Sequence, residues 1–510
     1  MKMVKSLILG SAAGLLAMSG AQAADLPVKA KAVEYVRICS LYGAGFYYIP
    51  GTDTCIKLGG YLRFDVLANT NSDDTGNTSG AGGANNRFTN GYTWRSREDL
   101  NIDTRTATEY GVVRTYFDAT FSWTTGTYAG NGTGATVYEP IGPSPFSSAP
   151  NNASAGAVAG GTVGVYLAFI QFAGFTIGKA ISTFSTPWVN YPGNNFDGLV
   201  GGGGTVTGVN QFTYTQEFGN GVSGSISAQD QTQYYQAGVN NLSAGGLFGT
   251  SDYAGSIAPD IVGVIKVDQA WGLFQASVAA HDNHAAYYGA TEITGHPDDR
   301  WGWAGQLGLS IKNIPTGPGD TINIQGVYTN GATRYNIQDL AASAGANTIY
   351  SGTSLATAYQ SVGFGIAPDT VFAAGFQQQL VQTWGMRGGF NHNWNPFWSS
   401  SVYGAWAAVQ YNGTAKTLIC ATPGVGFGVA AAAGVTSCNP DYNIGQVGFI
   451  TRWTPVKNLT FSGDVTFTHL DQKMAGTILA PSATIGKPAL AYELKDQNTV
   501  LLLLRAQRNW

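Results

Sequence analysis

Three segments near the start of the chain alternate charged with apolar residues, so that the charges fall on one face of an extended strand. In "YTWRSREDLNIDTR", residues 92–105, Arg95, Arg97 and Asp99 share one face, and Trp94 and Leu100 share the other. Rows of arginine and aspartate can attract or repel ions, or can pair with one another across neighbouring strands. The sequence leaves both interpretations open for the candidate residues, which are Lys57, Arg63, Asp65, Arg95, Arg97, Asp99, Arg114 and Asp118.

Other motifs give little support for an enzyme. No nucleophile–base constellation or phosphate loop stands out. "GNGVSG", residues 219–224, matches a dinucleotide-binding fingerprint, but no helical pattern follows it, and GNG is typical of a hairpin turn. "HDNH", residues 281–284, and His296 are too loosely spaced for a metal site, and we expect them at the surface without a ligand. We therefore expect no enzyme activity, no metal and no cofactor.

The N-terminus has the pattern of a secretory signal peptide. Lys2 and Lys5 precede an apolar run at residues 7–18, and small residues at 21–23 form a cleavage site, so we expect cleavage after Ala23. The whole chain is mildly acidic, with a net charge of −4, and has no basic footprint for nucleic acid. Few charged residues (11%), 70 glycines and many aromatic residues favour a β protein with long loops.

The four cysteines fall into two sequence-local pairs, Cys39 with Cys55 and Cys420 with Cys438. In an exported chain, an even number at such spacing favours two disulfides, each stabilising the fold by about 3 kcal/mol. A zinc site is the alternative, but neither pair has the C-x₂₋₄-C spacing that zinc ligands favour.

Alternation with a period of two recurs along the chain, as in "LTFSGDVTFTHL" at residues 459–470. A soluble β-sandwich gives the same pattern, but three features favour a transmembrane β-barrel. The strands have about nine to twelve residues, enough for a tilted crossing of a bilayer. The connections alternate between short and long, and the polar face is too charged for a dry core. The longest apolar stretch, residues 161–180, splits at Ala173-Gly174 into two strands instead of forming a spanning helix.

Counting by this alternation gives sixteen strands joined by seven short turns and eight long loops, which suits an all-β barrel with an aqueous channel. The first short turn is predicted at Ala107-Thr108, and residues 424–435 are predicted to form a loop. The tail, "TVLLLLRAQRNW", should pair with the first strand so that no sheet edge remains. We expect its leucines to face lipid and Trp510, an assembly signal, to lie at the interfacial aromatic girdle. The predicted strands are residues 56–66, 92–105, 110–121, 163–172, 175–180, 211–218, 222–229, 261–269, 273–281, 301–311, 321–328, 378–394, 397–410, 442–453, 459–467 and 499–510.

The segment "VEYVRICSLYGAGFYYIPGTDTCIKLGGYLRFD", residues 33–65, resembles the N-terminal signature of the alphaproteobacterial outer-membrane porins. This resemblance implies a homotrimer of sixteen-stranded barrels that passes small hydrophilic solutes passively. It implies a location in the bacterial outer membrane, in contact with lipid and lipopolysaccharide, and one long loop that folds into the lumen. The expected organisation is a signal peptide (1–23), a periplasmic-side segment (24–54) and the barrel (55–510). The sequence leaves open whether residues 24–54 cap the periplasmic mouth or lie along the first strand.

By position, the inward loop is the third long one, residues 181–210, here called loop 3. Trp188, Tyr191 and Phe196 can anchor it against the wall, and the glycines at 201–204 permit a fold-back. Its only charged residue is Asp197, and a single acid argues against strong cation selectivity. A mobile external loop is the alternative interpretation.

A passive general-diffusion pore is the leading functional hypothesis. The first rival is a substrate-selective channel whose constriction binds a sugar or an anion, and the aromatic residues of loop 3 could form a sugar track. Block by one solute at low concentration would favour that rival. The second rival is a barrel enzyme, which would be expected to have fewer strands.

Replacing Asp197 with Asn tests the predicted constriction. If this carboxylate lies at the narrowest point, its loss should shift ion selectivity modestly towards anions, because charged groups at a pore's waist bias ion passage. Reversal potentials in a salt gradient measure the shift, and an unchanged value would place Asp197 away from the constriction.

Overall fold

The computed structural model describes residues 37–69, 92–124, 162–195, 198–232, 234–244, 248–337, 348–351, 361–421, 434–480 and 490–510. Strands dominate these stretches, and their longest helix is α2 (Gly413–Cys420). No helix in them combines the length and apolarity needed to cross a bilayer. The chain divides into two compact units, Met1–Ile56 and Lys57–Trp510. The predicted signal peptide and most of the predicted loop at 424–435 lie outside the described residues.

The first unit is held together by a disulfide between Cys39 and Cys55, whose Cα atoms lie 6.1 Å apart. A short helical turn, η1 (Ser40–Tyr42), follows Cys39, and β1 (Tyr47–Tyr48) pairs antiparallel with the start of β2. Phe46 packs against both cysteines in a small buried cluster. The predicted disulfide is confirmed, whereas the periplasmic-side position of residues 24–54 stays a prediction.

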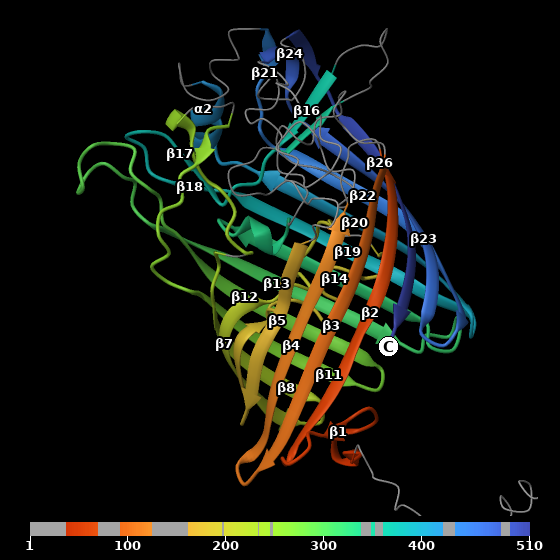
Figure 1. Cartoon of the computed structure of the whole chain (residues 1–510). Helices are drawn as coiled ribbons and strands as arrows, with labels where there is room; N and C mark the ends of the chain where they lie inside the picture. The colour runs from red at the N-terminus through yellow and green to blue at the C-terminus, as the bar shows by residue number, and fades with distance from the viewer. Residues whose placement is uncertain are drawn as a thin grey trace, which may run out of the picture. The chain divides into compact units, whose positions relative to one another are not determined.

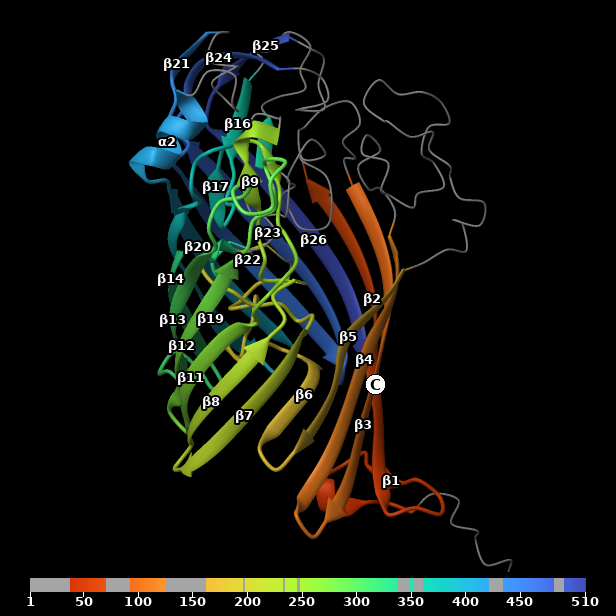
Figure 2. The ribbon, with the colours of Figure 1, turned by 90° about the vertical axis from the view of Figure 1, so that its left-hand side faces the viewer.

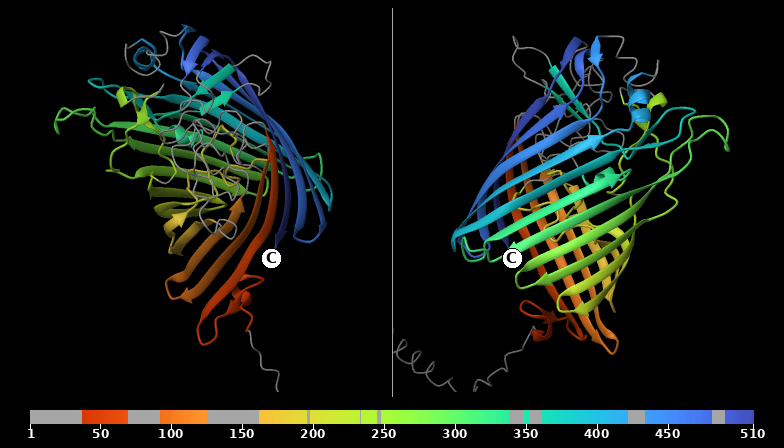
Figure 3. Two further views of the ribbon diagram at one scale, coloured as in Figure 1. Left: turned by 45° about the horizontal axis from the view of Figure 1, so that its top comes forward. Right: turned by 180° about the vertical axis from the view of Figure 1, so that it is seen from behind.

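The second unit is a closed antiparallel barrel, and the described residues contain sixteen strands that span it. Each strand pairs with the next along the chain, and the last pairs with the first from Tyr61 opposite Asn509 to Asn69 opposite Leu501. The strands slant around the wall in the way that closure of a sheet requires (Figure 1, Figure 3). The spanning strands are β2 (Thr54–Asn69), β3 (Tyr92–Thr108), β4 (Gly111–Thr124), β5 (Thr162–Phe172), β6 (Phe175–Ala180), β7 (Val209–Gly219), β8 (Val222–Gln229), β11 (Asp260–Gln269), β12 (Gly272–Asn283), β13 (Arg300–Lys312), β14 (Thr321–Asn330), β19 (Gln382–Asn395), β20 (Trp398–Gln410), β22 (Tyr442–Val456), β23 (Leu459–Gln472) and β26 (Gln497–Asn509).

The wall is apolar outside and polar inside, as the alternation predicted. On β2, Leu62 is 60% exposed, whereas Asp65 is fully buried. On β3, Trp94 is 48% exposed, whereas Arg95 is only 6% exposed. Because successive side chains of a strand point to opposite faces, each strand supplies both the lipid-facing surface and the lining of the lumen.

Seven short turns join the strands at one end of the barrel. At Ala173-Gly174 and Asn220-Gly221 both central residues have positive φ, between 50° and 86°, which is the geometry of a type I′ hairpin turn. This turn matches the right-handed twist of its flanking strands, so the hairpins of β5–β6 and β7–β8 form where they were predicted.

The first short turn lies two residues later than predicted. Ala107 and Thr108 are still paired, with Val112 and Gly111, and the turn consists of residues 109–110. The Thr108 hydroxyl donates to the carbonyl oxygen of Gly111 at 2.7 Å, and Gly111 has a φ of 117°. The threonine therefore closes the turn, a side-chain contribution that strand alternation cannot indicate.

At the opposite end of the barrel, the described parts of several long connections form regular structure of their own (Figure 2). Two small sheets form there, and a disulfide joins Cys420, at the end of α2, to Cys438, as predicted. The short elements are β9 (Val239–Asn241), β10 (Thr250–Ser251), β15 (Thr348–Ser351), β16 (Ser361–Gly365), β17 (Thr370–Phe372), β18 (Gln379–Leu380), β21 (Val435–Ser437), β24 (Ala475–Ala480), β25 (Leu490–Leu494), η3 (Leu242–Ala244) and η4 (Thr333–Tyr335).

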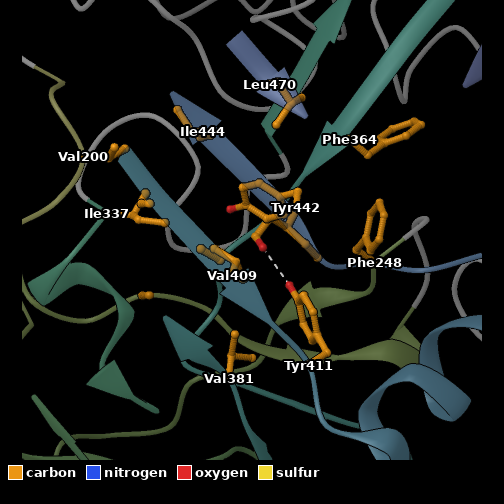
Figure 4. Packing of buried hydrophobic residues seen from close by; sticks show 14 of the residues in the cluster. Val200, Phe248, Ile337, Phe364, Val381, Val409, Tyr411, Tyr442, Ile444 and Leu470 are labelled. Carbon is orange, nitrogen blue, oxygen red and sulfur yellow. Dashed lines mark hydrogen bonds between the residues drawn. The ribbon is translucent and has the colours of Figure 1, made fainter. Parts of the chain in front are cut away.

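A hydrophobic core fills part of the barrel near this end, where the long connections fold against the wall (Figure 4). It joins wall residues such as Ile444 to residues of the connections such as Phe364. Leu501 and Leu503 of the tail belong to this core and are at most 2% exposed, so the expectation that the tail's leucines all face lipid is wrong. Only alternate leucines can face outward on a strand, and Leu504 does so.

The expectation that the histidines of "HDNH" lie at the surface is wrong for His281. Its imidazole is fully buried between two carboxylates, with Nδ1 2.9 Å from Asp260 Oδ1 and Nε2 3.4 Å from Asp369 Oδ2. The Tyr335 hydroxyl donates to Asp260 at 2.6 Å. These contacts tie the ends of β11 and β12 to the connection that contains η4 and β17.

Adding a side chain at Gly60 should destabilise the barrel. A Cβ atom there would lie 1.9 Å from the carbonyl oxygen of Asp99 and 3.0 Å from the ring of Trp510. Gly60→Val should cost roughly 1–3 kcal/mol, the usual penalty of overpacking. Urea unfolding followed by heat-modifiable gel migration measures the loss. Gly59→Val is the matched control, because its Cβ would meet only the flexible side chain of Asn101, and equal losses in both variants would contradict the argument.

Candidate functional site

The described part of loop 3 crosses the inside of the barrel, and its last two residues already belong to β7, which begins at Val209. Its hydrogen bonds reach inward-facing side chains on β12, β13, β14, β19, β22 and β23, far around the wall from β6 and β7. A segment that leaves one part of the wall and bonds to distant strands has to traverse the lumen. The predicted inward fold of loop 3 is therefore confirmed.

Glutamine side chains of three neighbouring strands hold the first half of loop 3. The amide of Gln275 donates to the carbonyl oxygens of residues 183–185 at 2.9–3.2 Å. The amide of Gln306 donates to the carbonyl of Phe184 at 2.8 Å. Gln325 accepts from the indole nitrogen of Trp188 at 2.6 Å, so this tryptophan contacts the wall. A carboxamide both donates and accepts, which suits it to pair with loop backbone away from water.

Arg387 of β19 is the largest of the fully buried side chains in the described residues, and its described partners all belong to loop 3. Its guanidinium group donates to Asn190 Oδ1 at 2.8 Å and to the carbonyl oxygens of Leu199 at 3.1 Å, Gly203 at 3.4 Å and Val189. One side chain thus ties together two parts of the loop that lie about a dozen residues apart.

The glycines of loop 3 allow its backbone to approach the wall closely. A Cβ atom at Gly201, where φ is 90°, would lie 2.2 Å from the carbonyl oxygen of Met386. A Cβ atom at Gly202 would lie 1.8 Å from the amide nitrogen of Gln325. The predicted fold-back at residues 201–204 is present, and its glycines are needed for this approach.

The middle of loop 3 is tied to the strands next to the closing seam. The backbone N–H of Asn195 donates to Asp464 Oδ2 at 2.7 Å, and its amide nitrogen donates to the Ser462 hydroxyl at 2.8 Å. Arg452 donates to the carbonyl oxygen of Gly193 at 2.8 Å. Loop 3 therefore has anchors on both sides of the space that it divides.

A cavity of about 570 Å³ lies between the middle of loop 3 and the wall formed by β2–β5, β22, β23 and β26. Five arginines and three tyrosines contribute to its lining, and two aspartates are the only acidic residues among the described residues that line it. The lining residues are Tyr61, Arg63, Arg95, Arg97, Asp99, Asp118, Tyr166, Leu167, Ile181, Tyr191, Asn194, Asn195, Val206, Arg452, Thr460, Ser462, Arg505 and Gln507.

Two of the five arginines share one carboxylate beside the seam. Asp65, fully buried, accepts from Arg95 at 2.8 Å and from Arg505 at 2.7 Å. Asp65 and Arg505 lie directly opposite each other in the pairing of β2 with β26. For Arg95 the pairing interpretation of the wall charges is therefore correct.

The other arginines have neutral hydrogen-bond partners among the described residues. Arg63 donates to Gln507 Oε1 at 2.8 Å and lies over the ring of Tyr61, 4.3 Å from its centroid. Arg97 donates to the Ser122 hydroxyl at 2.8 Å. These contacts fix the direction of each guanidinium group without neutralising its charge.

The predicted charged residues separate into distinct places. Arg63, Arg95, Arg97, Asp99 and Asp118 line the cavity, and Asp65 lies behind them. Lys57 is exposed and lies outside the cavity lining. Arg114 pairs with Asp103 at 3.0 Å and lines a second cavity, of about 540 Å³, on the wall from β4 to β12. Tyr191 lines the first cavity, and Phe196 and Asp197 lie outside the described residues.

Sequence reasoning missed three arginines of the lumen, namely Arg387, Arg452 and Arg505. Arg505 was visible in the tail, and the predicted pairing of the tail with the first strand could have placed it beside Asp65. Arg452 follows Thr451 in a predicted strand, but no alternating charge marks it. Arg387 lies in a glycine-rich strand, and nothing local indicates that it holds loop 3.

Comparisons with known proteins agree with this architecture. A sequence profile described as "Porin subfamily" matches residues 25–503. Porin Omp2b of Brucella suis biovar 1 is 36% identical over 284 residues, which cover 55% of this chain and 66% of that protein, and porin Omp2b of Brucella melitensis is 35% identical over the same length. The chain thus spans about two thirds of the length of these curated relatives. The outer membrane channel DcaP of Acinetobacter baumannii superposes with a TM-score of 0.54 at 15% identity, covering 91% of this chain and 99% of that one, a likeness of fold alone.

Replacing Arg387 with Met should loosen loop 3. The change removes four hydrogen bonds and leaves buried acceptors unpaired, at a cost on the order of 3 kcal/mol. We expect higher single-channel conductance and more open-channel noise in planar bilayers, because a detached loop obstructs the lumen less. Arg508→Met, at an exposed position near the C-terminus, is the matched control. Conductance and noise equal to those of the unmodified protein would show that Arg387 does not hold the loop.

Proposed function

Because this chain belongs to the porin subfamily, we propose that it forms a passive diffusion pore for small hydrophilic solutes and ions. The chain is an outer-membrane β-barrel, and its family consists of channels. The observation that carries the proposal is the lumen itself. A closed wall with a polar inner face surrounds a charged cavity, and loop 3 narrows that lumen.

We further propose the organisation and partners that the sequence analysis expected. Residues 1–23 would be removed on export, residues 24–54 would lie on the periplasmic side, and residues 55–510 would form the barrel. The division of the chain after Ile56 supports the boundary between the last two. The barrel would assemble as a homotrimer in contact with outer-membrane lipid and lipopolysaccharide, as the family resemblance implies.

The outer surface supports a position in the membrane. Large apolar side chains are exposed on the outward face of strands around the barrel, including Phe212, Val278, Leu307 and Val447. A soluble protein rarely exposes a continuous apolar surface of this extent, whereas a barrel in lipid requires one.

Planar-bilayer recording on the purified oligomer tests the proposed pore. We expect a linear current–voltage relation and a conductance that follows the bulk conductivity of KCl, because a water-filled lumen passes ions without a saturable step. In liposome swelling, neutral sugars should enter at rates that fall smoothly with their size. A heat-unfolded sample is the control. Absence of conductance would refute the pore, and block by one sugar at low concentration would favour the substrate-selective channel instead.

A further inference from the structure

The cavity beside loop 3 carries more positive than negative charge. Five arginines and two aspartates line it, and Asp65, buried on the inner face of the wall, is shared by two of the arginines. A further buried carboxylate, Asp464, accepts from the backbone N–H of the lining residue Asn195 at 2.7 Å. Counted together among the described residues, five positive charges face four negative ones. The remaining described residues of the lining are neutral, so one positive charge stays unbalanced among the described residues at the cavity.

Three guanidinium groups of the lining have no carboxylate among their described hydrogen-bond partners, and they come from separate parts of the wall. Arg63 lies on β2, Arg97 on β3 and Arg452 on β22. Their described hydrogen bonds go to Gln507, to the Ser122 hydroxyl and, for Arg452, to the Ser401 hydroxyl at 2.9 Å and the carbonyl of Gly193. Every one of these acceptors is neutral.

The three groups are also held in place before any solute arrives. Arg63 lies over Tyr61, the Arg97 guanidinium lies 5.6 Å from the ring centroid of Tyr166, and Arg452 is fixed between its wall and loop 3. A guanidinium group has five donors, and the described bonds of Arg63 and Arg97 use one nitrogen each. Donors in a fixed fork match the paired oxygens of a carboxylate or phosphate.

We propose that this cavity is a binding site for small organic anions that carry carboxylate or phosphate groups, with Arg63, Arg97 and Arg452 as their ligands. The inference rests on the proposed pore and names the solutes that the pore favours. Neutral solutes would still diffuse through, whereas oxyanions would be concentrated at loop 3 and would hold the site for longer. The opposing interpretation is that the arginines only brace the wall and the loop.

The test combines ion selectivity with competition in planar bilayers. Reversal potentials in a KCl gradient give the chloride-to-potassium permeability ratio, which should exceed one. Added inorganic phosphate or succinate should then reduce the chloride current in a saturable way. Comparing the half-blocking concentrations of phosphate and succinate shows which oxyanion the site prefers. Saturable block of the chloride current by either anion supports the proposal.

The double variant Arg63→Gln/Arg97→Gln should raise the half-blocking concentration by about tenfold and lower the permeability ratio, because two charge-assisted hydrogen bonds are lost. Lys266→Gln is the matched control, since it removes one positive charge from the second cavity, and it should leave the half-blocking concentration unchanged. Heat-modifiable gel migration verifies that each variant is folded. If the double variant misfolds, Arg452→Gln alone should still raise the half-blocking concentration.

Several results would overturn the inference. Cation selectivity of the unmodified protein would do so, as would the absence of saturable block by both anions. An equal change in the double variant and in Lys266→Gln would show a general effect of charge without a site. In all three cases the linear conductance would persist, so the proposed pore would stand. Only a protein without any conductance would remove the pore and this site together.

Discussion

The pairing of β2 with β26 is the interaction on which the rest of the structure depends. Lipid offers no hydrogen-bond partner to a free sheet edge, so the first and last spanning strands have to meet. At this seam Asp65 and Arg505 are direct neighbours, and their ion pair joins the two ends of the barrel sequence. Because the sheet is closed, every strand has one face towards lipid and one towards the lumen, and the polar face becomes the place where loop 3 can bind.

Much of the barrel could be predicted from the sequence, because a strand exposed to lipid on one side and to water on the other alternates strictly. The bounds of β6 and β8 agree with their predictions, and Ala173-Gly174 and Asn220-Gly221 have turn chemistry that fixes where their hairpins end. The prediction that the leucines of the tail face lipid failed because a run of identical residues has no alternation. A local pattern also cannot reveal that Leu501 packs into a core formed by distant connections. The prediction that His281 lies at the surface was wrong for a similar reason, since its carboxylate partners lie 21 and 88 residues away in the sequence.

The candidate site was predictable only where its residues lie in the first strands. Arg63 and Arg97 stood out because their charges alternate with apolar residues over a short span. Arg452 and the glutamines that hold loop 3 did not, because a single polar residue on a strand looks the same whether it faces water, a neighbour or a loop. Their role follows from closure, which brings strands far apart in the sequence onto one lumen, and from the need of an internal loop for partners to its backbone groups.

Neutral side chains make many of the hydrogen bonds that hold loop 3 to the wall. The charged side chains that line the cavity are therefore not all needed to anchor the loop. Gln275, Gln306 and Gln325 satisfy the loop backbone without adding charge. The one buried cation among these anchors, Arg387, is enclosed by loop carbonyls and does not line the cavity. The arginines that do line it supply the positive charge of the cavity. The field at loop 3 is therefore set by the count and placement of arginines against aspartates, and loss of one carboxylate to protonation could only make it more positive.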